Sequence, residues 1–143
     1  MSEQENIKII RASFDAFNAH GLDRWSSFQA DDYMAANPAA PGSLNREQSR
    51  MLQQGFLTAF PDLHFDVTRT VAHGDDVVLH WTATGTHTGP LRTPSGNTVA
   101  PTGKQVSIVG SSTIEIKNGK IAGAWAFWDR ASMLDQLGLL PPM

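Results

Sequence analysis

Trp125-Ala126-Phe127-Trp128-Asp129 is the stretch that decides the fold, because it has the pattern of a last β-strand that leads directly into a helix. It follows Asn118-Gly119, a strong hairpin-turn signal, and precedes a short apolar helical pattern that ends at Gly138. Side chains alternate along a strand, so Trp125, Phe127 and Asp129 are predicted to share one face. The strand is therefore expected to deliver a carboxylate into aromatic surroundings.

Asp129 has two predicted uses. A carboxylate held against aromatic rings loses hydration and keeps its proton more readily, which is how a general acid or base is prepared. Trp125 and Phe127 would then form the substrate-binding surface beside it. Asp129 also stands directly before the helical pattern from Arg130 to Leu134, where aspartate is a favoured N-cap. The sequence pattern leaves both uses open.

The overall composition limits the classes of function. With 143 residues, the chain is predicted to form one domain, residues 1–143, with a substantial hydrophobic core. The net charge of −3 argues against nucleic acid or an anionic membrane as partner. The chain has no cysteine, which excludes disulfides, thiolate metal sites and a cysteine nucleophile. No window approaches the ~20 apolar residues of a membrane span and the start is acidic, so a cytoplasmic protein is expected.

Helices are predicted in the first part of the chain. Apolar residues recur at helical spacing from about Glu5 to Ala19, and a short second helix follows from Asp23. Residues 45–60 form a third helical pattern that starts with a capping-box sequence. A short strand from Tyr33 to Asn37 is expected between the second and third helices.

From Leu63 onward the hydrophobic period changes from 3.6 to two, which predicts a run of antiparallel strands. Helices segregated from such a run of strands indicate an α+β fold. The inward row of the strand that starts at Val77 is predicted to include Trp81 and His87. The long loop over residues 88–103 is expected to cover a pocket mouth.

Several short motifs run through most of the chain in an order that resembles a known family. They lie at residues 60–65, 85–89, 101–104, 118–121, 125–129 and 136–138. In these motifs the chain resembles the SnoaL-like polyketide cyclase (ester cyclase) family of the nuclear transport factor 2-like superfamily. The resemblance implies a cone-shaped, curved, antiparallel or mixed sheet, with three N-terminal helices on its concave face enclosing a pocket and a short C-terminal helix. It also implies a homodimer that needs no metal or organic cofactor.

The resemblance implies chemistry as well as a fold. Characterised relatives close the last ring of aromatic polyketide esters by intramolecular aldol condensation, with an aspartate at the end of the last strand as the key group. By position that aspartate corresponds to Asp129. The expected ligand is a small apolar or aromatic carbonyl compound. The expected activity is a cofactor-free cyclisation in which one carboxyl group both takes and gives a proton.

Four further residues are candidates for the same pocket. His87 is predicted to donate a hydrogen bond to a substrate oxygen, and it equally fits a turn residue bonded to nearby backbone. Asn37 is predicted to offer its amide hydrogens, or to start a turn because it precedes Pro38. Tyr33 and Trp81 would form flat apolar walls, or simply belong to the core. The histidines have no metal-ligand spacing, so no metal site is expected.

Three functions stay open on this reading. The first is a cyclase with Asp129 as acid and base. The second is a hydrolase or dehydratase on the same scaffold, which needs a second acid or an arginine in the pocket, and Arg69 is the inward candidate. The third is a non-catalytic module that binds a small apolar ligand, with Asp129 only as a helix cap. The direction of the Asp129 side chain distinguishes the third from the others.

Overall fold

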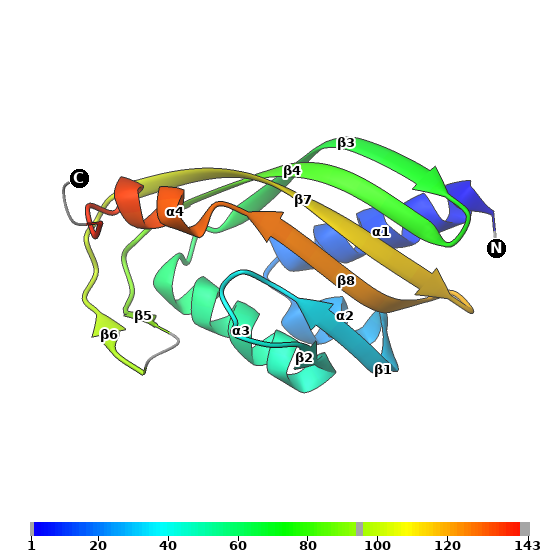
Figure 1. Cartoon of the computed structure of the whole chain (residues 1–143), viewed down its shortest axis with the longest axis horizontal. Helices are drawn as coiled ribbons and strands as arrows, with labels where there is room; N and C mark the ends of the chain where they lie inside the picture. Colours follow the sequence, from blue (N-terminus) through cyan, green and yellow to red (C-terminus); the bar gives the residue numbers. More distant parts are fainter. Residues whose placement is uncertain (1, 94–95, 141–143) are drawn as a thin grey trace.

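The computed structural model describes residues 2–93 and 96–140 of the chain. Three helices lie along one side of a strongly curved sheet, and a fourth follows the last strand (Figure 1). The helices are α1 (Glu3–Asn18), α2 (Leu22–Ser27), α3 (Arg46–Ala59) and α4 (Arg130–Gln136). No helix within the two described ranges is both long and apolar enough to cross a membrane.

The main sheet has six strands across the described residues, in the order β2-β1-β8-β7-β4-β3. They are β1 (Gln29–Ala36), β2 (Leu44–Asn45), β3 (His64–His73), β4 (Asp76–Thr86), β7 (Gln105–Lys117) and β8 (Lys120–Trp128). All neighbouring strands are antiparallel except β1 and β8, which run parallel. The predicted α+β class, with a curved mixed sheet and three N-terminal helices, is confirmed (Figure 1).

The ends of the helices follow from local hydrogen bonding. Ser2 caps α1, where its side chain accepts a hydrogen bond from the Glu5 backbone N–H at 3.1 Å. At the start of α3, Asn45 accepts from the Gln48 N–H at 2.8 Å, and Gln48 accepts from the Asn45 N–H at 2.9 Å. These bonds satisfy N–H groups that a helix start otherwise leaves without partners. The predicted capping box is confirmed.

The pairing register shifts at three places among the described strands, and two of these shifts are one-residue β-bulges. In β8, Gly123 pairs with Glu115 and Ile121 with Ile116, so Ala122 has no opposite residue. In β3, Thr68 is the extra residue between two pairs with β4. Because side chains alternate with a period of two, one extra residue turns the following side chains to the opposite face. Arg69 follows the bulge in β3 and is exposed, so the prediction that it faces inward is wrong.

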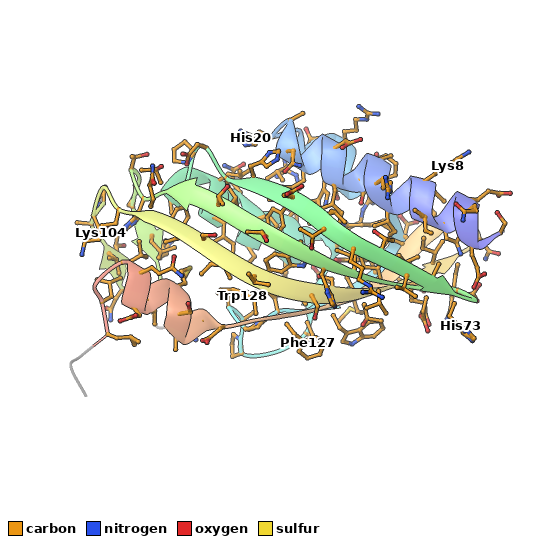
Figure 2. The ribbon with its side chains drawn as sticks, turned by 90° about the horizontal axis from the view of Figure 1, so that it is seen from above. Lys8, His20, His73, Lys104, Phe127 and Trp128 are labelled. Atoms are coloured by element: carbon orange, nitrogen blue, oxygen red, sulfur yellow. The ribbon has the colours of Figure 1, made fainter. Side chains whose placement is uncertain are left out.

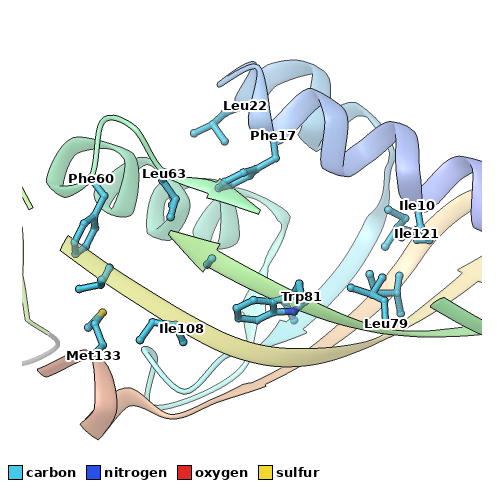
Figure 3. Close-up of a cluster of buried hydrophobic side chains, with 14 of the residues drawn as sticks. Ile10, Phe17, Leu22, Phe60, Leu63, Leu79, Trp81, Ile108, Ile121 and Met133 are labelled. Atoms are coloured by element: carbon cyan, nitrogen blue, oxygen red, sulfur yellow. The ribbon is translucent and has the colours of Figure 1, made fainter. Parts of the chain in front are cut away.

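The core fills the space between the concave face of the sheet and the helices. The predicted inward row of β4 is confirmed, since Val77, Leu79, Trp81 and Ala83 are all buried. Trp81 pairs with Gly110 of β7, and a Cβ atom at Gly110 would lie 2.4 Å from the indole. The missing side chain of Gly110 therefore gives the Trp81 ring its room. Figure 3 shows Phe17, Leu63 and Trp81 directed between the helices and the sheet.

The predicted loop over residues 88–103 contains a small hairpin, formed by β5 (Leu91–Arg92) and β6 (Thr98–Val99). Residues 94 and 95 of this loop lie outside the described residues. The loop begins tightly against α3, because the backbone N–H groups of Thr88 and Gly89 both donate to the Ala59 carbonyl at 3.1 Å. Leu91 is buried there. The hairpin is thus attached to the end of α3.

Candidate functional site

A hollow lies between the concave face of the sheet and helices α1 and α3. Its cavity volume is about 160 Å³, which is below the several hundred Å³ common for small-molecule sites. Most of its wall is apolar. The aromatic residues of the lining include Phe14, Phe17, Phe56, Phe65, Trp81 and Trp128. Such a surface suits a flat, largely apolar molecule.

The two central tryptophans are held in place by hydrogen bonds. The Trp81 indole N–H donates to the Ser112 hydroxyl at 3.0 Å, and its ring centre lies 4.9 Å from that of Phe65. The Trp128 indole N–H donates to the Asn37 amide oxygen at 3.2 Å, and the Trp128 ring packs edge-on against Phe56. Each indole therefore presents an apolar face to the hollow with its polar N–H already satisfied.

The polar groups of the lining are concentrated on one wall. Gln29, Tyr33 and Asn37 follow one another along β1 and the turn after it, and Ser49 and Gln53 face them from α3. Tyr33 is buried, and this burial raises the pKa of its phenol, while a hydrogen bond with the Ser49 side chain lowers it by less. The phenol therefore stays neutral and able to donate at physiological pH.

The lining carries no formal charge. Of the described residues around the hollow, Tyr33 is the sole ionisable one, and none is an aspartate, glutamate, histidine, lysine or arginine. An ionised ligand would have to lose its hydration there without an opposite charge to replace it, which is costly. The site therefore favours a neutral ligand.

Three of the predicted site residues do come together in the hollow. Tyr33 and Trp81 are both buried and line it, so each is a core residue and a wall at once. Asn37 also lines it, and its amide oxygen accepts from the Ala39 N–H at 2.9 Å as well as from Trp128. The turn predicted at Asn37 is present, and the residue also lines the hollow.

The structure corrects the predicted surroundings of Asp129. The residue is exposed, and its carboxylate accepts a hydrogen bond from the Ser132 backbone N–H at 3.0 Å as the N-cap of α4. Of the two predicted uses, the geometry is that of the cap. The neighbouring rings are not around it either, because Trp125 is 42% and Phe127 is 63% exposed.

The bulge at Ala122 is the physical reason for this correction. Beyond it, Ala124, Ala126 and Trp128 line the hollow, whereas Trp125 and Phe127 face outward. Phe127 and Trp128 are labelled in Figure 2. On the outer face the Trp125 ring covers Gly123, whose absent Cβ would lie 3.0 Å from the indole. The aromatic residue of β8 that belongs to the site is therefore Trp128, which the sequence pattern placed on the wrong face.

His87 is not part of the hollow. It is fully buried at the end of β4, its ring lies against Phe60, and its Nδ1 accepts from the Thr102 backbone N–H at 3.2 Å. Burial lowers the pKa of the imidazole, and a backbone hydrogen bond at Gly89 raises it by less. The geometry does not place His87 where it could donate to a substrate in the hollow. It matches the other predicted use, a residue bonded to nearby backbone, and it holds the two ends of the 88–103 loop together.

Sequence reasoning missed Gln29 as well as Trp128. The predicted strand began at Tyr33, whereas β1 begins at Gln29, which lies on the same inward face four residues earlier. In the part of the chain that the structure describes, no three histidine, aspartate or glutamate side chains group in a way that could hold a metal ion.

Comparison with known proteins identifies the family. The family model described as SnoaL-like polyketide cyclase matches residues 7–137. The chain belongs to the SnoaL-like polyketide cyclase family. Its fold is the cone-shaped one of nuclear transport factor 2-like proteins. Among curated protein sequences none matches the chain.

Solved structures agree with this assignment. AclR from Streptomyces galilaeus, provisionally assigned as a hydroxylase, is 28% identical with a TM-score of 0.85, over 98% of this chain and 100% of that one. IdmH from Streptomyces antibioticus, provisionally assigned as a polyketide cyclase, is 26% identical with a TM-score of 0.76, over 93% and 98%. A SnoaL-like protein from Jannaschia sp. CCS1 shares the fold, with 21% identity and a TM-score of 0.82 over 98% and 95%.

The cap geometry of Asp129 predicts how its variants unfold. Asp129→Ala should lower the free energy of unfolding by about 1 kcal/mol, because the Ser132 N–H loses its acceptor. Asp129→Asn keeps an acceptor oxygen and should stay close to the original protein. Urea denaturation of both variants measures this difference. Equal losses in the two variants would contradict a role based on the hydrogen bond.

The burial of Tyr33 predicts a pH effect that can be read directly. Tyr33 is the one tyrosine of the chain, so the ultraviolet absorbance of phenolate reports it alone, and its midpoint should lie above 10.0. The unfolded chain ionises its phenol first, so the native state should lose stability as the pH rises through and beyond 10.0. Tyr33→Phe should lack this part of the alkaline loss. A native midpoint at or below 10.0 would refute the prediction.

Proposed function

We propose that the protein is a cofactor-independent cyclase that folds a small, neutral, apolar or aromatic carbonyl compound and joins two of its carbons by an aldol-type reaction. Membership of the SnoaL-like polyketide cyclase family supports a cyclase activity. The observation that carries the finer proposal is the chemistry of the hollow, which has aromatic walls and one neutral ionisable group, Tyr33. The reaction and its substrate class are inferred from that chemistry.

The first contribution of the hollow is shape. An intramolecular aldol reaction requires one carbon of the substrate to lie against a carbonyl carbon of the same molecule. The rings of Phe65, Trp81 and Trp128 offer flat surfaces that hold a folded chain in this arrangement. Such positioning can supply much of the rate increase, because reacting groups already in contact lose little further freedom on the way to the transition state.

The second contribution is a donor at the place where negative charge develops. The substrate reacts as the enol of a 1,3-dicarbonyl unit, so no strong base is needed to form the nucleophile. The enol carbon forms the new C–C bond as the π bond of the attacked carbonyl breaks, and its electron pair moves to that oxygen. The Tyr33 hydroxyl gives its proton to this oxygen, and the proton that the enol loses returns to Tyr33. No co-reactant is consumed.

Asp129 has no part in this proton transfer, because its carboxylate is exposed and bonded to the start of α4. The raised pKa of Tyr33 fits a donor, since a phenol that resists ionisation keeps its proton until charge develops next to it. Ser49 can hold the phenol in position through their hydrogen bond. Tyr33 thus has the role of proton donor that the sequence analysis gave to Asp129.

A non-catalytic binding module is the second candidate. It is favoured by one observation: within the described lining, no carboxylate or imidazole is available as a strong general base. Such a module would bind the same class of ligand and release it unchanged. Turnover, rather than binding, distinguishes it from a cyclase.

The proposed donor predicts the effect of Tyr33→Phe on catalysis. A panel of aromatic methyl esters that carry poly-β-keto side chains, assayed by chromatography for the cyclised product, would measure it. On a panel member that the protein converts, Tyr33→Phe should lower kcat/KM about 10²-fold, which is typical for the loss of one donor to a developing oxyanion.

Asp129→Asn is the matched control for this assay and should keep nearly full activity. Unchanged turnover in Tyr33→Phe would remove the proposed donor, and loss of activity in Asp129→Asn would restore the aspartate mechanism. Binding of panel members without conversion of any would favour the binding module.

We also infer that the expected homodimer forms through the outer face of the sheet. Phe127 is 63%, Val109 72% and Val78 39% exposed on three neighbouring strands. Between them the outward residues of these strands include Ser111, Thr113 and His80, and the charged Arg69 and Glu115 lie at the margin of this patch. A patch whose centre has no fixed charge can meet a second copy of itself with little opposition between like charges.

This surface predicts the oligomeric state of two variants. Phe127→Glu should shift the protein from dimer to monomer in analytical ultracentrifugation, because it places paired carboxylates in an apolar interface. Met51→Glu is the control, since Met51 is equally exposed at 63% but lies on α3. A monomeric unmodified protein, or a dimer that survives Phe127→Glu, would rule this interface out.

A further inference from the structure

One buried polar side chain in the described lining of the hollow has an atom without a partner. Gln29 lines the hollow and is only 4% exposed, and its amide oxygen Oε1 is buried without a hydrogen bond from any described residue. Its backbone pairs with Ile121, which fixes it where β8 begins. A buried amide oxygen that has given up water and gained nothing destabilises a protein. An unpaired acceptor at this place therefore indicates a missing donor.

The other polar groups of the hollow show that Gln29 is different. Ser112 accepts from Trp81, and Asn37 accepts from Trp128, so these oxygens are already in use. Ser13 donates to the Ile10 carbonyl at 2.7 Å. These groups have hydrogen-bond partners within the chain, whereas the Gln29 amide oxygen has none among the described residues.

The surroundings of Gln29 limit what this donor can be. The terminal torsion of a glutamine is soft, so the amide can adjust to a donor in the hollow that Gln29 lines. Ile121, which pairs with Gln29 in the sheet, is apolar, and no carboxylate stands in the described lining. An ammonium donor would lose its hydration without a balancing charge. A neutral hydroxyl group can donate a hydrogen bond and carries no charge, so it suits this end of the hollow.

We propose that Gln29 binds a free hydroxyl group of the substrate, a phenol or an enol, and so selects hydroxylated ring compounds over those that lack this group. This inference rests on the proposed function, because it takes the hollow as the substrate site. Gln29 and Tyr33 lie four residues apart on β1, a span of at most about 14 Å. A ligand of several rings can therefore place its hydroxyl at Gln29 while its reacting carbonyl faces Tyr33.

Two probes that differ by one methyl group test the proposal: 2-naphthol carries the hydroxyl, and 2-methoxynaphthalene does not donate. Their dissociation constants can be measured by isothermal calorimetry or by quenching of tryptophan fluorescence. The unmodified protein should bind 2-naphthol about tenfold more tightly. In Gln29→Met, which keeps the side-chain length and removes the amide, the two probes should bind equally, with the affinity for 2-methoxynaphthalene unchanged.

Gln53→Met is the matched control, because Gln53 lines the same hollow from α3. It should keep the tenfold preference. Equal affinities in the unmodified protein overturn the proposal, and this comparison holds even where Gln29→Met fails to fold. A preference that survives in folded Gln29→Met also overturns it. Binding of neither probe removes the hollow as a ligand site, whereas the cyclisation assay alone decides whether the protein is a cyclase.

Discussion

The single extra residue in β8, Ala122, determines which side chains of the last strand reach the hollow. Two consecutive side chains on a strand point to opposite faces, so one unpaired residue exchanges the inner and outer sets beyond it. Trp128 thereby enters the site and bonds to Asn37, while Trp125 and Phe127 become surface residues. The exposed position of Asp129 follows from the same shift. The chemistry available to the protein depends on this one irregularity in pairing.

The result is a site that relies on shape and neutral donors. Its walls are aromatic, the indole N–H groups of Trp81 and Trp128 are already bonded, and its ionisable group is a phenol that burial keeps protonated. Charged catalytic groups would be costly to hold in such surroundings. A substrate that contains its own acidic carbon and its own electrophile is suited to this arrangement, because the protein then needs to supply position and one proton donor.

Much of the fold could be predicted from the sequence, because hydrophobic periods report burial directly. The helices, the inward row of β4 and the capping box at Asn45 all followed from local patterns. The site could be predicted only in part. Trp81 was found because it lies on a regular strand and Asn37 because it precedes Pro38, whereas Asp129 and Arg69 were misplaced because each follows a bulge. A bulge is set by how two strands pair, and a period read along one strand does not contain that information.

The parallel pairing of β1 with β8 has a consequence for how the protein is made. Gln29 and Ile121 are neighbours in the sheet although most of the chain separates them. The Lys120 ammonium likewise donates to the Ser27 carbonyl at 2.9 Å, although these residues are about equally far apart in the sequence. Contacts between such remote segments form slowly, since a long loop must close first. During synthesis the aromatic interior stays uncovered until the last strand leaves the ribosome. The enclosed chamber is thus completed late, and the nascent chain needs protection from aggregation until then.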